Sequence, residues 1–404
     1  MAEKACRVRA VRCDHRATDA EIYRQLERVT EPLERAWEQL ARARTVVLKF
    51  NLMGTQPPVF AGRLRELVDP SVARAALRLL RSRTTARLIA TDTTVYHGDY
   101  RTPDDFNYRP VLDEFGVEYD DSNMPPFATY EVPGGGCMFT RYTLSGVFRA
   151  ADAVVSIAKM KNHLFQGVTL STKNLFGLPP MKPPEGRTRS YYHHLIRLSY
   201  VLPDLAMITR PCLNIIEALV GQAGREWDGR GRVGNALIAG DHCIATDACG
   251  AYLMGHEPTA DWPTPPFRRD RNHLLIAAER GFGTVDLRQI DFETEVEPPL
   301  ADFDADEIDP PQTVANWRRT ACEQGLFYQA NQQRLVSQYA NEFIYLQDGE
   351  VVWHGADPAH LESRRVLSGE RKDSALWLKL VDPDEREGEH FEVYAECLRL
   401  AGWR

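Results

Sequence analysis

The chain has 404 residues, which leaves room for two or three domains of about 150 residues each. Hydrophobic residues make up 43% and charged residues 26%, so the composition is that of a globular protein and excludes a disordered one. The formal net charge of -8 argues against a nucleic-acid partner, because binding to phosphate backbones requires a basic surface. No apolar run reaches the roughly 18 residues of a membrane span, and the N-terminus has no apolar signal segment. We therefore expect a cytoplasmic protein without a membrane or nucleic-acid partner.

Short apolar runs alternate with helical segments over residues 1–295. Strands are expected at residues 45–51, 87–91, 153–157, 213–216 and 236–239. This alternation is typical of βαβ units, so residues 1–295 are predicted to form an α/β domain. Its sheet is expected to be mostly parallel with helices on both faces. The glycine-rich segment 127–143 predicts a hairpin inserted between these units.

Acidic residues and prolines predict a linker at residues 296–311. Beyond it, residues 312–404 are expected to form a helix and a small α+β domain. Two alternating segments there flank Asp348-Gly349, which is typical of a hairpin on a two-residue type I′ turn. A further strand is expected at residues 375–381.

Residues 156–177 contain the densest set of reactive side chains, directly after a predicted strand. Lysines, a histidine, hydroxyls and an amide are interleaved with glycines: Lys159, Lys161, His163, Thr169, Ser171, Lys173 and Asn174. Ligands of open α/β sheets bind beyond the carboxyl ends of the strands. Lysines beside a helix start attract anions. The segment therefore predicts a site for a small carboxylate or phosphate.

Other candidates also follow predicted strands, and we assign all of them by residue type. The residues expected to carry catalysis are His163, Lys173, His193 and His194. Those expected to bind the substrate are Lys159, Lys161, Thr169, Asn174, Asn51, Thr93 and Thr94. A divalent metal, if present, is assigned to His163, His193, Asp92 and Asp247.

Two of these assignments contain alternatives. Because His193 and His194 are adjacent, they cannot both face one ligand, and we expect one of them at the site and the other exposed. Lys173 is either an amine whose pKa neighbouring lysines lower, or the partner of Asp247 or Glu217 in a buried ion pair.

The order of these residues resembles domain-of-unknown-function family 362 over about residues 40–260. The resemblance is carried by Lys159-x-Lys161-x-His163, Gly167-Val168-Thr169, Lys173-Asn174-Leu175-x-Gly177, Gly240-Asp241 and Ala245-x-Asp247. Some members carry ferredoxin modules, but the eight cysteines here form no C-x-x-C pair, so an iron–sulfur cluster is not expected. The C-terminal module is similar to another small uncharacterised domain.

A more distant resemblance concerns the nickel-pincer lactate racemase family. His163, Gly167, Thr169 and Lys173 reproduce the spacing of its histidine, glycine, small polar residue and lysine. This resemblance implies a shared fold and active-site position, with Lys173 as the anchor of a nickel-pincer nucleotide. Ser171-Thr172 stand where that family has paired glycines.

These patterns favour an enzyme of small-molecule metabolism that acts on a small anion by lysine, histidine and aspartate acid–base chemistry. An isomerase, a lyase and a transferase all fit this description. The alternatives are a non-catalytic protein that binds a small anion or a metal, and a scaffolding protein that recruits a partner through its C-terminal module. An oligomer is compatible with each.

Overall fold

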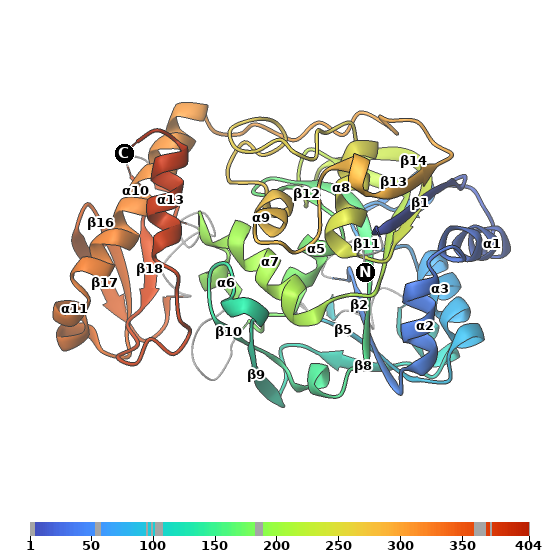
Figure 1. The fold of residues 1–404 in the computed structure, drawn as a ribbon, viewed down its shortest axis with the longest axis horizontal. Helices are drawn as coiled ribbons and strands as arrows, with labels where there is room; N and C mark the ends of the chain where they lie inside the picture. Colours follow the sequence, from blue (N-terminus) through green and yellow to red (C-terminus); the bar gives the residue numbers. More distant parts are fainter. Residues whose placement is uncertain are drawn as a thin grey trace.

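The computed structural model describes residues 5–52, 58–93, 96–97, 100–101, 108–181, 189–358, 369–371 and 374–403. A large sheet has helices on both faces, and a smaller unit of helices and strands made by the C-terminal residues lies beside it (Figure 1). Thr94, one of the expected substrate-binding residues, lies outside the described residues.

The large sheet has the strand order β15-β1-β14-β13-β11-β2-β5-β8, with the short β12 paired to β11. Its strands are β1 (Arg7–Arg12), β2 (Thr45–Phe50), β5 (Arg87–Asp92), β8 (Glu118–Asp121), β11 (Ala153–His163), β12 (Gly167–Thr169), β13 (Leu213–Ala223), β14 (Arg230–Gly240) and β15 (Asp291–Thr294). From β13 to β8 all neighbours are parallel, whereas β14 is antiparallel to both β13 and β1. The predicted α/β class with a mostly parallel sheet is confirmed.

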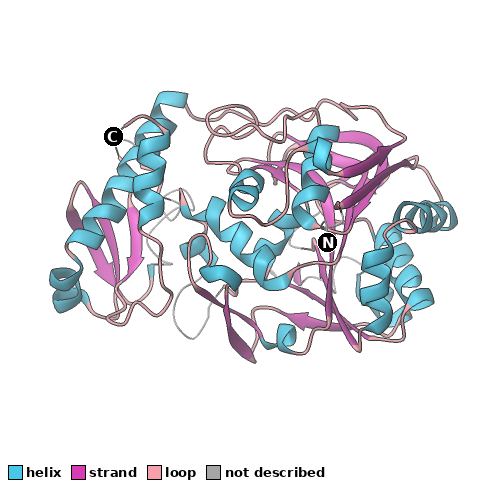
Figure 2. Cartoon of the chain, viewed as in Figure 1, coloured by secondary structure: helices cyan, strands magenta, loops and turns pink. Residues whose placement is uncertain are grey.

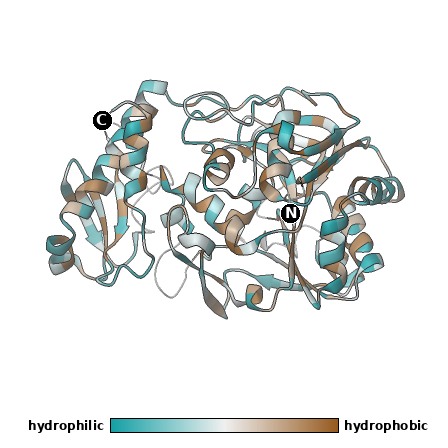
Figure 3. Cartoon of the chain, viewed as in Figure 1, coloured by the Kyte–Doolittle hydropathy of each residue, from teal (hydrophilic) through white to brown (hydrophobic). Residues whose placement is uncertain are grey.

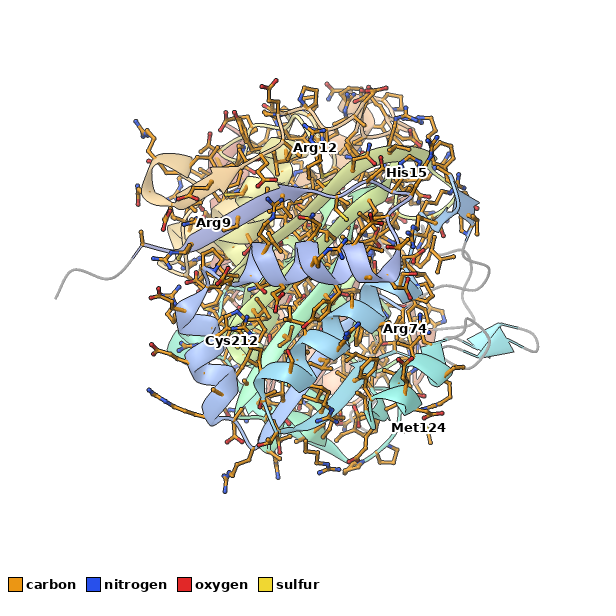
Figure 4. All side chains as sticks on the ribbon, turned by 90° about the vertical axis from the view of Figure 1, so that its right-hand side faces the viewer. Arg9, Arg12, His15, Arg74, Met124 and Cys212 are labelled. Carbon is orange, nitrogen blue, oxygen red and sulfur yellow. The ribbon has the colours of Figure 1, made fainter. Side chains whose placement is uncertain are left out.

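Helices α1 (Asp19–Thr30), α2 (Glu34–Arg42) and α3 (Pro70–Arg83) lie across one face of the sheet (Figure 4). Helix α1 is largely hydrophilic (Figure 3), and its apolar residues Ile22, Leu26 and Val29 are buried in the core of that face. On the other face lie α7 (Arg197–Thr209), α8 (Cys243–Leu253) and α9 (His273–Glu279) (Figure 2). The sheet is therefore buried on both faces, as its apolar strands require.

The inserted hairpin is confirmed as β9 (Phe127–Glu131) paired with β10 (Arg141–Ser145). Its connecting loop is fastened to α7 by the buried carboxylate of Asp204. This carboxylate accepts the main-chain N–H groups of Cys137, Met138 and Phe139 and the hydroxyl of Tyr142. Burial raises the pKa of Asp204 to about 6.

The C-terminal unit contains α10 (Pro311–Ala330), α11 (Gln332–Tyr339), α13 (Glu392–Leu400) and a sheet of order β17-β16-β18. Its strands are β16 (Phe343–Gln347), β17 (Glu350–Gly355) and β18 (Trp377–Leu380). Asp348 and Gly349 have φ values of 53° and 80°, as a type I′ turn requires, so the predicted hairpin is confirmed.

The segment 296–311 runs along the larger unit and has three buried anchors, Val296, Phe303 and Ala305. The division of the chain into two domains at this segment stays a prediction. In the part of the chain that the structure describes, no helix is both long and apolar enough to span a membrane.

A buried charge cluster joins α7 to the C-terminal unit. Arg197 lies 2.9 Å from Glu389, and both side chains are fully buried. Lys379 lies 2.8 Å from each of Glu387 and Glu389. Breaking such a pair leaves an uncompensated buried charge, so the cluster fixes the position of α7 against the C-terminal unit.

Candidate functional site

A cavity of about 280 Å³ opens at the carboxyl ends of β2, β5 and β11. It is lined by eight of the residues expected from the sequence: Asn51, Asp92, Lys161, His163, Thr169, Lys173, Asn174 and His193. It also contains residues that sequence reasoning did not assign to the site, above all Lys49, Phe176, Arg189, Glu226 and Trp227. Its position is the one at which open α/β sheets bind ligands.

His163 ends β11, and its ring orientation is fixed by the turn that follows. Nδ1 accepts the main-chain N–H groups of Phe165 at 3.0 Å and Gln166 at 3.2 Å. The proton of the neutral ring is therefore on Nε2. Nε2 lies 3.7 Å from Oε1 of Glu226, so this carboxylate lies beside the Nε2–H donor. Because Nε2 already carries the ring proton, it can donate a hydrogen bond to a ligand, while the carboxylate of Glu226 is the group of this pair that can take up a proton.

Lys49 and Asp92 form a buried ion pair of 2.9 Å at the ends of β2 and β5. Lys49 also donates to Oδ1 of Asn174 at 3.1 Å, and Asn174 Nδ2 donates back to Lys49 O at 3.0 Å. Burial lowers the pKa of Lys49, and Asp92 opposes this effect. A Cβ on Gly177 would lie 2.2 Å from Oδ1 of Asp92, so only glycine allows this close approach. Asp92 and Asn174 thus shape the cavity wall through contacts within the protein.

Two polar side chains of the cavity wall have unused hydrogen-bonding capacity. Oδ1 of Asn51 and Oγ1 of Thr169 are buried and have no hydrogen-bond partner among the described residues. The two residues are 9% and 5% exposed. Buried polar atoms are rarely left without a partner, so both atoms are suited to contact a polar ligand.

Two of the residues expected to bind the substrate lie outside the cavity lining. Lys159 is fully buried and pairs with Glu217 at 2.6 Å, which also removes Glu217 as the expected partner of Lys173. Thr93 donates its hydroxyl to Gly177 O at 2.5 Å. Both side chains were expected to face a ligand at a strand end, but the fold turns them into the core.

His193 and His194 point in different directions, as expected for adjacent residues. His193 lines the cavity, and its ring centre lies 6.0 Å from that of His163. The expectation that the other histidine is exposed is wrong. His194 is fully buried, Nε2 lies 2.8 Å from Leu376 O of the C-terminal unit, and burial lowers its pKa to about 4. Its predicted catalytic role is therefore not compatible with its position.

The predicted set of metal ligands is also wrong. Asp247 lies in α8 outside the cavity lining and accepts the N–H groups of Ser171 at 2.8 Å and Thr172 at 2.6 Å. Burial raises the pKa of Asp247 to about 7. Asp92 is paired with Lys49, and Nδ1 of His163 is used by the main chain. Within the described ranges, no three His, Cys, Asp or Glu side chains are grouped so that they could hold a metal ion.

The family model with the description Domain of unknown function (DUF362) matches residues 46–252, about half of the chain. The chain belongs to this family. The matched region of this DUF362 protein contains every residue that lines the cavity. The expected family membership is confirmed. No relative was found among curated proteins.

Two solved structures are similar to this DUF362 protein. The lactate racemase apoprotein from Thermoanaerobacterium thermosaccharolyticum is 14% identical with a TM-score of 0.36, and the match covers 61% of this chain and 56% of that one. A protein from Thermotoga maritima is 12% identical with a TM-score of 0.30, and the match covers 54% of each chain. This DUF362 protein thus spans little more than half of either structure, and neither likeness carries an argument about activity.

Glu226 and Trp227 are the most informative residues that sequence reasoning missed. The apolar run 213–216 predicts a short strand, but β13 continues to Ala223 through polar residues. Glu226 and Trp227 therefore follow shortly after the end of β13, just as other lining residues follow the ends of their strands. The true length of β13 is the signal that would have identified them.

Proposed function

We propose that this DUF362 protein is an enzyme that binds a small carboxylate or phosphate in the cavity and moves a proton of that ligand with Glu226, beside the Nε2–H donor of His163. The observation that supports this proposal is the fixed tautomer of His163 beside Glu226, inside a cavity rich in cations. The described lining contains four lysine or arginine side chains and two carboxylates. Such a balance favours an anionic ligand.

Each wall of the cavity has a separate task in this proposal. Lys173 and Arg189 both lie over the ring of Phe176, at 4.7 Å and 4.9 Å from its centre, and would hold the anionic group. Glu226 would take or give the proton, and Nε2–H of His163 would donate a hydrogen bond to the ligand oxygen on which negative charge develops. Asn51 would accept a hydrogen bond from the ligand and thereby orient it.

Proton movement can be observed without knowledge of the physiological reaction. In D₂O, NMR would follow deuterium uptake next to the carboxylate in a panel of 2-hydroxy and 2-oxo monocarboxylates, with binding of each compound and of inorganic phosphate measured by calorimetry. We expect uptake with wild type, binding without uptake for Glu226→Gln, slower uptake for His163→Gln, and loss of binding for Lys173→Gln. Arg288→Gln, a change at an exposed side chain, is the control.

Two results would contradict the proposal. Uptake that persists in Glu226→Gln would show that another group moves the proton. Binding without uptake in wild type would favour the alternative of a small-anion binding protein. No step of this proposal passes through a metal ion, because no three His, Cys, Asp or Glu side chains of the described residues are grouped to hold one. Mass spectrometry under denaturing conditions and elemental analysis of the purified protein check this point.

A further inference from the structure

The three lysines of β2 and β11 are buried, and one of them differs from the others in its surroundings. Lys49 lies 2.9 Å from the carboxylate of Asp92, and Lys159 lies 2.6 Å from that of Glu217. Lys161 is 2% exposed and lines the cavity, but its Nζ donates to two neutral main-chain carbonyls. It therefore lacks the direct carboxylate contact that the other two lysines have.

The two carbonyls and an aromatic ring define the geometry of the Lys161 amine. Nζ lies 2.9 Å from Glu66 O, 3.3 Å from Glu226 O and 4.8 Å from the centre of the Trp227 ring. A neutral amine has two N–H groups and one lone pair, and the two carbonyls accept both N–H groups. The third N–H of an ammonium group would be placed against the Trp227 ring, and in the neutral form the lone pair takes this place. The geometry thus accommodates the neutral, nucleophilic form that reacts with a carbonyl group.

The electrostatic surroundings act in the same direction. Burial lowers the pKa of Lys161 to about 8, and the carboxylates of Glu66 and Glu226 only partly oppose this effect. About half of the population is then a free amine at pH 8. A desolvated lysine of this kind is the usual nucleophile toward carbonyl carbon.

We propose that Lys161 forms an imine with the carbonyl group of an anionic substrate, of the class of 2-oxo acids or aldehydes that carry a carboxylate or phosphate. This inference rests on the proposed function, because the same cavity must first bind the anion. Lys173 and Arg189 hold the charged end, and the carbonyl carbon lies at the amine.

The step balances without an oxidant or a reductant. The lone pair of Nζ forms a bond to the carbonyl carbon, while the carbonyl oxygen, held by Nε2–H of His163, takes a proton from the solvent. Nζ then gives one proton back to the solvent. The carbon–oxygen bond then breaks, and the oxygen leaves as water with the second amine hydrogen. The product is a neutral imine, and water is the only other product.

Reductive trapping tests this proposal on the full-length protein. Wild type is treated with pyruvate and sodium borohydride, and intact-mass and peptide analysis follow. We expect one reduced pyruvate adduct per chain on the Lys161 peptide, with a trapping rate that rises through about pH 8. Acetone, a neutral carbonyl, should give at least tenfold less adduct, and inorganic phosphate should protect the site.

Variants separate this inference from the proposed function. Lys161→Gln should still bind phosphate, more weakly because one lysine of the lining is removed, and should give no adduct, whereas Lys173→Gln should keep the site of modification but require more pyruvate. An adduct on Lys173, or one spread evenly over exposed lysines, would overturn the inference. If phosphate binds and deuterium uptake occurs but no adduct forms, the imine is wrong and the proposed function stands. If phosphate does not bind, both are wrong.

Discussion

Oε1 of Glu226 lies 3.7 Å from Nε2 of His163, while the other oxygen of the same carboxylate accepts the N–H of Leu164 at 2.9 Å. The residue that follows the histidine thus anchors the carboxylate that faces it. Because the turns after β11 and β13 are joined in this way, the direction of the Nε2 proton depends on both strands.

The charge of Glu226 should control the protonation of His163. Glu226→Gln keeps an oxygen for the N–H of Leu164 but removes the negative charge near the ring, so the ring should take up its proton only at lower pH. Ring NMR signals followed from pH 4 to pH 9 measure this shift. Glu66→Gln is the matched control, because Glu66 accepts from the N–H of Asp228 instead. Equal titration curves for wild type and Glu226→Gln would contradict the expectation.

Gly177 should tolerate no side chain. In Gly177→Ala the new Cβ would lie 2.2 Å from Oδ1 of Asp92 and 2.7 Å from Nζ of Lys49, so the buried pair must separate. We expect a loss of about 3 kcal/mol or more in the free energy of unfolding, measured in urea. Gly281→Ala serves as control, since a Cβ there meets open space and only the positive φ opposes it. Its expected loss is about 1–2 kcal/mol.

Asp247 should make stability depend on pH. Its folded pKa of about 7 lies above the usual aspartate value of 3.8, so the folded state binds more protons than the unfolded state between these values. Stability from this group is complete below about pH 4 and is lost as pH rises toward 7. The difference between wild type and Asp247→Asn in the free energy of unfolding should therefore fall from pH 5 to pH 8.

A surface aspartate provides the control for that pH series. Hydrogen bonds from Arg288 hold the pKa of Asp286 below its usual range. Asp286 stays charged over the whole interval, so the difference between wild type and Asp286→Asn should not change from pH 5 to pH 8. A parallel pH trend in the two variants would show that the trend does not come from Asp247.

The charge cluster between α7 and the C-terminal unit should be essential for stability. Glu389→Gln leaves the fully buried Arg197 without its carboxylate, and we expect a loss of about 3–5 kcal/mol in the free energy of unfolding. Arg288→Gln removes a surface pair and should cost less than about 1 kcal/mol. Urea unfolding of the two variants compares them directly. Similar losses would mean that solvent reaches the cluster.

The sequence predicts the parallel centre of the sheet well, because strands buried on both faces appear as continuous apolar runs. It predicts the antiparallel edge poorly. Strand β14 begins at Arg230, well before its apolar run 236–239. In this first part the side chain of Arg230 contacts Asp306, and that of Arg232 contacts the main chain of Asp302. These polar residues pair with a segment that is distant in the sequence, and the residue pattern of the strand itself does not predict that segment.

The candidate site was also predicted only in part, because the pairing of strands decides which side chains face the cavity. Residues at apolar strand ends, such as His163 and Asn51, line the cavity as expected. Lys159 has the same residue type and neighbourhood as Lys161, yet it contacts Glu217, which lies on the adjacent strand. Which lysine is paired with a carboxylate depends on the register between neighbouring strands. The order of residues along the chain does not predict this register.

The position of β1 has a consequence for synthesis on the ribosome. This strand pairs with β14 and β15, so its nearest partner begins at Arg230. At the usual rates of translation, residues 7–12 wait roughly 10–50 s before that partner emerges. Throughout this interval the strand has an open edge, and the positive charge of Arg7, Arg9 and Arg12 opposes its pairing with other chains.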